Sequence, residues 1–261
     1  MDNLIKFNYQ ECFEKSDQIF ESFNKNGVVH IDNVFSEKLC IETIEILKEI
    51  ELNLLENLNE VGLVTEEINN EILIKYYQGL FSKNNIFRKF FSSRLIKIAQ
   101  ILLREDDLYF SDIETHIRNP GGSSIPKHQD NFYFNLSNAR GMTCYVALNY
   151  HDILLGGLNY ILGSHIKRVI PHSLSKEAGF SSGIENSTIE KKGLKGKKIY
   201  QPIYFPGSVT IHHPENIHFA NSVDIDSQRS FALSVRIFSQ RETIDDKGVE
   251  RYKKLLSQNR S

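Results

Sequence analysis

The chain has 261 residues, of which 40% are hydrophobic and 25% charged, and its formal net charge is −2. This balance is typical of a globular domain and argues against a nucleic-acid-binding surface, which needs concentrated positive charge. No stretch approaches the roughly 18 consecutive apolar residues of a membrane-spanning helix, and no basic leader followed by an apolar run opens the chain. We therefore expect a single cytoplasmic domain, monomeric or homodimeric, that binds neither nucleic acid nor membrane.

The first part of the chain, residues 1–107, is expected to be mainly helical and to support the β-sheet core. Residues 37–58 carry apolar side chains at helical spacing, and Ser36 stands before them as an N-cap. A second helical pattern covers residues 93–103 and is too apolar for a helix surrounded by solvent. Both segments are expected to pack against a sheet.

From residue 108 the pattern changes to short apolar or alternating runs separated by turn signals at 119–122, 156–157 and 206–207. Roughly seven or eight strands over residues 108–238 fit a double-stranded β-helix, the jelly-roll scaffold of cupins. Residues 173–196 are polar and glycine-bearing, and we expect a long loop over the barrel mouth, either a lid or disordered. Residues 239–261 are expected to form a helical tail. The predicted fold is thus mainly β with N-terminal α-helices and a jelly-roll core.

Three scattered cysteines, Cys12, Cys40 and Cys144, show no Cys-x-x-Cys spacing. An odd, unclustered set predicts neither a disulfide framework nor a zinc knuckle. The cysteines are therefore consistent with a reducing compartment.

The most informative motif is His128-Gln129-Asp130, followed at a distance by His218. Residues i and i+2 of a strand point to the same face, so His128 and Asp130 can approach one ion while Gln129 points away. A third ligand would come from a neighbouring strand. Two imidazoles and one carboxylate on one face of an Fe(II) ion leave three coordination positions open for reactants.

His212 and His213 compete with His218 for the role of third ligand, because both lie close to His218 in the sequence. Arg229, eleven residues after His218, favours His218. We predict a metal site made of His128, Asp130 and His218.

The order and spacing of these residues and their surroundings resemble the phytanoyl-CoA dioxygenase-like family of Fe(II)/2-oxoglutarate oxygenases. The resemblance covers roughly residues 20–238, and its carriers are the metal motif, the arginine that follows it and three glycine-bearing or strand-like segments at 142–148, 156–165 and 204–212. An opening segment at 23–35 is of the kind with which such proteins begin. These features are specific for the family only when they occur together.

The resemblance implies that His128, Asp130 and His218 bind iron and that Arg229 pairs with the distal carboxylate of 2-oxoglutarate. A guanidinium suits this role because it forms bidentate hydrogen bonds to carboxylates. Thr115 and Tyr145 match family positions that line the co-substrate pocket. The implied reaction is hydroxylation of an unactivated C–H bond in a small, polar metabolite, with O2 consumed and succinate and CO2 released.

Two positions refine this prediction. Related halogenases have glycine or alanine where this chain has Asp130, so the carboxylate favours hydroxylation. Relatives often have serine where this chain has Ala220, so one hydrogen bond to the co-substrate is missing or supplied elsewhere.

Two other function classes remain open at this stage: a catalytically inactive jelly-roll protein that binds a ligand, and a non-oxidative cupin that holds another metal. Contact with substrate is also open for His116, His165 and His172, with a structural role favoured for His165. In the aromatic run that follows the motif, Phe132 or Phe134 should face the iron cavity if the segment is a strand.

Overall fold

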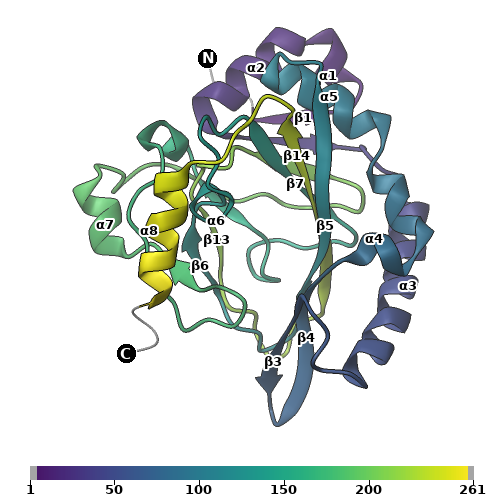
Figure 1. Cartoon of the computed structure of the whole chain (residues 1–261). Coiled ribbons are helices and arrows are strands. Elements are labelled where there is room, and N and C mark those ends of the chain that lie inside the picture. Colours follow the sequence, from purple (N-terminus) through teal and green to yellow (C-terminus); the bar gives the residue numbers. More distant parts are fainter. Residues whose placement is uncertain (1–4, 258–261) are drawn as a thin grey trace.

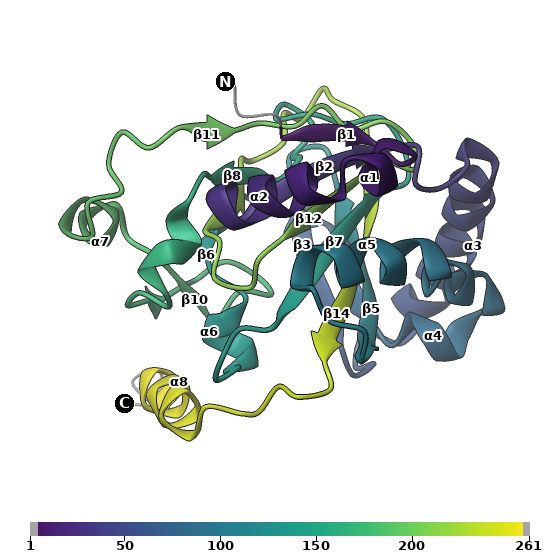
Figure 2. The same cartoon turned by 90° about the horizontal axis from the view of Figure 1, so that it is seen from above.

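The computed structural model describes residues 5–257, apart from the side chain of Asp112, and consists of two facing β-sheets with helices outside them. Figures 1 and 2 show the large sheet covered by α3, α4 and α5 on one side, with the small sheet, α7 and α8 on the other. The helices are α1 (Glu11–Glu14), α2 (Ser16–Asn26), α3 (Glu37–Leu55), α4 (Leu80–Lys83), α5 (Ser93–Leu103), α6 (Asn131–Phe134), α7 (Asn186–Lys191) and α8 (Asp246–Ser257), with 3-10 turns at Asn85–Phe90 and Ser164–Lys167.

The large sheet has the strand order β1-β2-β12-β7-β14-β5-β4-β3, and the small sheet has the order β11-β8-β13-β6. A short pair, β9-β10, stands apart from them. The strands are β1 (Lys6–Asn8), β2 (Val28–Asp32), β3 (Leu63–Ile68), β4 (Glu71–Gln78), β5 (Leu108–Arg118), β6 (Ile125–His128), β7 (Gly141–Ala147), β8 (Asn159–Ile161), β9 (Ser173–Leu174), β10 (Ser182–Gly183), β11 (Ile199–Tyr200), β12 (Val209–His212), β13 (His218–Ala220) and β14 (Ser230–Ser239). The prediction of a mainly β jelly-roll core is confirmed.

The helical support forms because apolar residues recur along one face of each helix and bury against the outer face of the large sheet. Leu47 of α3 and Leu95 of α5 belong to the same buried cluster as Val146 of β7 and Leu233 of β14. Burying a leucine side chain stabilises a fold by about 1.5–3 kcal/mol, so this layer holds the sheet in place. The Ser36 hydroxyl accepts a hydrogen bond from the Leu39 amide at 3.3 Å, as an N-cap does.

Strand alternation separates this helix-facing layer from the interior of the barrel. On β14, Phe231 and Leu233 point into the helix-facing cluster, while Ala232 packs among interior residues. Ser234, two positions further on, lines the cavity between the sheets. Which face a residue of β14 or β5 occupies therefore decides whether it can take part in a site.

Two segments differ from the sequence-based prediction. Residues 1–107 contribute β1, β2, β3 and β4 to the large sheet in addition to helices. The sequence did not predict β2, which lies between β1 and β12 with nearly every side chain buried. It therefore lacks the alternation of apolar and polar residues that marks a half-exposed strand. Residues 173–196 are not a structureless loop, because they contain β9, β10 and α7.

The tail is helical over α8, and its residues 258–261 lie outside the part of the chain that is described, as do residues 1–4. Across residues 5–257, none of the helices has the length and apolar character that crossing a membrane requires.

Candidate metal and co-substrate site

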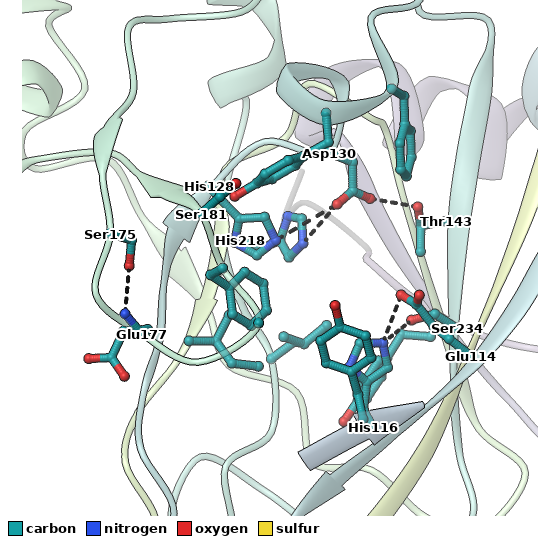
Figure 3. A pocket seen from close by; sticks show the side chains of 18 of the residues that line it. Glu114, His116, His128, Asp130, Thr143, Ser175, Glu177, Ser181, His218 and Ser234 are labelled. Atoms are coloured by element: carbon teal, nitrogen blue, oxygen red, sulfur yellow. Dashed lines mark hydrogen bonds and ion pairs between the residues drawn. The ribbon is translucent and has the colours of Figure 1, made fainter. Parts of the chain in front are cut away.

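A cavity of about 670 Å³ opens between the two sheets. Figure 3 shows His128, Asp130 and His218 together at one end of it and Glu114, His116 and Ser234 at the other. A cavity of this size suits a small ligand, because such pockets usually measure roughly 300–1,000 Å³.

The three predicted metal ligands converge from two adjacent strands of the small sheet. His128 ends β6 and His218 begins β13, and the two residues are direct partners in the antiparallel pair. Asp130 does not continue the strand, as the sequence analysis assumed. Its backbone is already helical, with φ −56° and ψ −37°, and it starts α6. The Asp130 carboxylate therefore reaches the histidines across a strand-to-helix turn, and Gln129 still points away into a buried hydrogen-bond network.

The donor atoms of the triad lie within 4.8 Å of one another. Oδ1 of Asp130 is 3.8 Å from Nε2 of His128 and 3.6 Å from Nε2 of His218. Each histidine bonds through Nδ1 to the backbone carbonyl two residues before it, at 2.8 Å for His128 and 3.0 Å for His218. If Nδ1 carries the proton in each ring, Nε2 presents its lone pair to an ion.

Burial keeps the donor atoms in the protonation states that a metal requires. Burial lowers the pKa of His128, and it lowers the pKa of His218 well below its ordinary value, so both rings are neutral near pH 7. Burial alone would raise the pKa of the Asp130 carboxyl, but His218, His212 and His128 outweigh it and hold that pKa well below the usual range. Two neutral imidazoles and a carboxylate match the donor set of mononuclear Fe(II) sites.

The outer oxygen of Asp130 is held by two further side chains. Thr143 Oγ1 donates to Oδ2 at 2.6 Å, and His212 Nε2 lies 3.2 Å from the same atom. Thr143 of β7 and His212 of β12 are direct partners in the large sheet. His212 thus contacts the outer oxygen of Asp130, and its ring centre lies 4.3 Å from that of His218. The group of donor atoms that could hold a metal ion consists of His128, Asp130 and His218, so His218 remains the predicted third ligand.

The sequence pattern of the phytanoyl-CoA dioxygenase (PhyH) family matches residues 23–229. The chain belongs to this family. The match contains all three members of the triad and ends at Arg229, so the family resemblance drawn from the sequence is confirmed. A search of curated proteins finds no match.

Several solved structures share the fold. SnoN, an epimerase from nogalamycin biosynthesis solved with Fe3+ and alpha ketoglutarate, is 16% identical, with a TM-score of 0.68 and coverage of 92% of this chain and 89% of SnoN. EctD from S. alaskensis, solved with 2-oxoglutarate and 5-hydroxyectoine, is 14% identical, with a TM-score of 0.66 and coverage of 84% of this chain and 74% of EctD. AviO1 from Streptomyces viridochromogenes Tue57 is 11% identical, with a TM-score of 0.68 and coverage of 86% of this chain and 95% of AviO1.

Of the residues matched to the family's co-substrate pocket, Tyr145 lines the cavity and Thr115 does not. Tyr145 lies on β7, and its hydroxyl is 3.3 Å from Nε2 of His151. Thr115 lies between two cavity residues of β5, so it points to the opposite face, where its β14 partner Leu233 joins the helix-facing cluster. Its hydroxyl bonds to the Ala232 carbonyl at 3.4 Å.

The structure does not bring Arg229 to the cavity either. Arg229 immediately precedes β14 and contacts the helix-facing side, where its guanidinium lies 5.0 Å from the ring centre of Phe231. Nη2 pairs with Oε1 of Glu51 at 2.5 Å, and Nε donates to Oδ1 of Asn119 at 3.0 Å. These contacts fasten α3 to the edge of the barrel, and they leave the predicted co-substrate contact without support in this geometry.

Of the remaining histidines and aromatic residues discussed above, some line the cavity and others pack outside it. His116 lines the cavity. His165 bonds to the Asn24 carbonyl at 2.9 Å, outside the cavity. His172 stacks on Phe132 at 3.9 Å between ring centres and is 3.2 Å from the Gln129 amide nitrogen. Because the segment is helix α6 instead of a strand, Phe134 reaches the cavity while Phe132 packs against His172.

A polar cluster on the cavity wall was missed by the sequence analysis. Arg236 pairs with Oε1 of Glu114 at 2.6 Å, and Gln78 donates to Oε2 of Glu114 at 3.1 Å. Nε2 of His116 lies 2.9 Å from the Ser234 hydroxyl. These residues are distributed over β4, β5 and β14 and form no local motif. Only the register of the sheet, which brings Glu114 opposite Ser234, could have revealed them.

Proposed function

We propose that the protein is an Fe(II)- and 2-oxoglutarate-dependent hydroxylase that oxidises an unactivated C–H bond of a small, polar metabolite and releases succinate and CO2. The observation that carries the proposal is the convergence of His128, Asp130 and His218 at one end of the cavity between the two sheets. Family membership and the iron and 2-oxoglutarate bound in SnoN and EctD support the choice of cofactors.

In this proposal, His128, Asp130 and His218 hold the iron on one face, and Thr143 and His212 fix the carboxylate that completes that face. When bound, the ferrous ion supplies the redox chemistry by which O2 and 2-oxoglutarate oxidise a C–H bond. Asp130 also bears on the type of reaction. Its carboxylate fills the position that a halide would need, which favours hydroxylation over halogenation.

The far end of the cavity offers a recognition surface for polar groups. Glu114 is held ionised, because Arg236 and His116 outweigh the effect of burial and lower the pKa of Glu114 to about 2. The wall therefore presents an anion, a guanidinium and a hydroxyl within one patch. A substrate that carries both hydrogen-bond donors and acceptors fits this surface better than a hydrocarbon chain does.

Aromatic side chains cover the metal end. The Phe180 ring centre lies 5.0 Å from that of His128, and Tyr133 donates from its hydroxyl to the Ser182 carbonyl at 2.8 Å. These contacts tie the segment between β9 and β10 over the triad. Their expected role is to exclude water while the substrate C–H bond is positioned near the ion.

The proposal is tested by two measurements on the same protein. Anaerobic calorimetry should show binding of Fe(II) followed by 2-oxoglutarate, and aerobic incubation with ascorbate and a panel of small polar metabolites should yield succinate with one oxygen atom added to a metabolite. Asp130→Ala should lose iron binding and succinate formation together, since it removes a ligand.

The same measurements distinguish the two rival functions. Binding of a metabolite without affinity for iron would indicate an inactive ligand-binding jelly roll. Affinity for zinc or manganese without any binding of 2-oxoglutarate would indicate a non-oxidative cupin. Either result overturns the proposal.

A further inference from the structure

The end of the cavity opposite the triad carries two polar atoms that a ligand can use. Tyr76 of β4 and His116 of β5 are direct partners in the large sheet, and both half-buried side chains line the cavity. The His116 ring makes its contacts through Nε2, which lies 2.9 Å from the Ser234 hydroxyl and 3.3 Å from Oε1 of Glu114. Among the residues that the structure describes, neither Nδ1 of His116 nor the Tyr76 hydroxyl has a hydrogen-bond partner.

The neighbouring carboxylate sets the hydrogen-bonding role of His116. A carboxylate only accepts hydrogen bonds, so Glu114 favours the tautomer that carries the proton on Nε2. Nδ1 then offers its lone pair to the cavity, and the Tyr76 hydroxyl can accept a hydrogen bond as well. This part of the wall therefore suits a ligand group that donates hydrogen bonds.

The charges at this end favour a cation over an anion. The pKa of Glu114 is about 2, so its carboxylate is negative at neutral pH. Arg236 pairs with Glu114 at 2.6 Å, and its guanidinium lies 5.0 Å from the ring centre of Phe134. An anionic ligand would lie beside Glu114, and the guanidinium that would offset the repulsion already pairs with that carboxylate. A cationic ligand adds a favourable partner to the same carboxylate.

Aromatic rings surround these acceptor atoms. The ring centres of Tyr76 and Tyr145 lie 6.0 Å and 6.1 Å from that of His116. Phe134 and Tyr252 also line the cavity. The faces of aromatic rings are electron-rich and attract ammonium groups, so rings placed around a carboxylate and an acceptor nitrogen form a surface suited to a positively charged nitrogen.

We propose that Tyr76, Glu114 and His116 form a subsite for the ammonium group of an amine substrate. The inference rests on the proposed function and narrows its small, polar metabolite to one that carries a positively charged nitrogen. The ammonium group donates to Nδ1 of His116 and to the Tyr76 hydroxyl, and Glu114 supplies the opposite charge. Because this end faces the triad across the cavity in Figure 3, binding there places a C–H bond further along the molecule near the metal.

The first test compares three probes that share a six-carbon chain with a hydroxyl at one end. The other end is an ammonium group in 6-aminohexan-1-ol, a hydroxyl in hexane-1,6-diol and a carboxylate in 6-hydroxyhexanoate. Calorimetry on the protein loaded with Mn(II) and saturating 2-oxoglutarate, which does not turn over, measures the three affinities. The amine should bind at least about tenfold more tightly than the diol, and the carboxylate should bind most weakly.

A second test gives the subsite a cation of its own. Gln78 lines the cavity and donates to Oε2 of Glu114 at 3.1 Å, so Gln78→Lys places an ammonium group beside the carboxylate. Gln78→Met is the neutral control of similar length. The lysine variant should bind the amine at least about tenfold more weakly than the methionine variant does, whereas the diol should distinguish the two variants little.

A third test removes one hydroxyl from β4 and keeps the ring. Tyr76→Phe should reduce the preference for the amine over the diol roughly threefold or more, because a hydrogen bond from a charged donor is lost. Tyr77→Phe is the matched control on the same strand. The Tyr77 hydroxyl bonds to Glu60 at 3.2 Å and its ring lies in the helix-facing cluster, so the preference should stay as in the wild type.

The outcomes separate this inference from the proposed function. An amine that binds no more tightly than the diol, or that does not bind, overturns the ammonium subsite, as do equal affinities for the amine in the two Gln78 variants. The oxygenase proposal stands in each of these cases, because the titrated protein has already bound metal and 2-oxoglutarate. A wild type that does not bind 2-oxoglutarate overturns the proposed function and the assignment of a substrate together.

Discussion

The hydroxyl of Thr143 donates to Oδ2 of Asp130 at 2.6 Å. His212, which faces Thr143 across the β7–β12 pair, approaches the same oxygen at 3.2 Å. Both contacts act on the outer oxygen, so Oδ1 is left to face the two histidines of the triad. The large sheet thus orients the carboxylate of a predicted ligand whose histidine partners lie on the small sheet.

Thr143→Val should weaken metal binding without unfolding the protein. The substitution keeps the shape of the side chain and removes the hydrogen bond that orients Asp130. Loss of such a supporting contact typically lowers metal affinity about 10- to 100-fold. Calorimetric titration with Fe(II) under anaerobic conditions measures the change. Thr43→Val is the control, because Thr43 is also buried but its hydroxyl bonds within α3, to the Leu39 carbonyl. Equal affinities for the two variants would contradict the role of Thr143.

His218 and His212 should respond differently to the same substitution. His218→Gln removes a predicted ligand and should abolish both iron binding and succinate formation. His212→Gln removes only a contact to Asp130 and should reduce iron affinity about tenfold while turnover persists at saturating iron. The measurement is succinate formation as a function of Fe(II) concentration. The reverse order of severity would make His212 the third ligand.

The helices and the barrel could be predicted because their patterns are local. Residues 93–103 repeat apolar side chains at helical spacing, and α5 has those bounds. The first four strands could not be predicted in the same way. β2 is buried on both faces, so its sequence shows no alternation, and its place between β1 and β12 depends on chain segments far apart in the sequence.

The metal triad could be predicted from spacing, whereas the co-substrate end could not. His128, Asp130 and His218 form a recognisable set of donors, and the structure gathers them. The position of Arg229 depends on which face the start of β14 presents, and a change of one residue reverses that face.

Glu114 should make the stability of the protein depend on pH in the acid range. Its folded-state pKa is about 2 and its ordinary value is 4.5, because Arg236 and His116 overcome the effect of burial. The ionised carboxylate therefore stabilises the fold fully above pH 4.5, and this contribution of roughly 1–3 kcal/mol is lost as the pH falls from 4.5 towards 2.

Urea unfolding of the wild type and of Glu114→Gln from pH 7 down to about pH 3 measures this contribution. The wild type should be the more stable protein at pH 7, and the difference should narrow below pH 4.5, since glutamine does not titrate. A difference that stays constant over this range would show that the Glu114 charge does not stabilise the fold.

Phe180→Ala should uncouple the consumption of 2-oxoglutarate from oxidation of the substrate. Phe180 lies over His128, and the segment that carries it is tied down by Tyr133 to Ser182 and by Tyr252 to Ser181 at 3.0 Å. Removal of the ring opens the metal end to water and loosens the position of the substrate, so succinate should form in excess of hydroxylated product, whereas iron affinity should change little. The ratio of succinate to product is the measurement, with Phe205→Ala, a half-exposed phenylalanine that does not line the cavity, as the control. A ratio that matches the control would place the barrier to water in another part of the cavity wall.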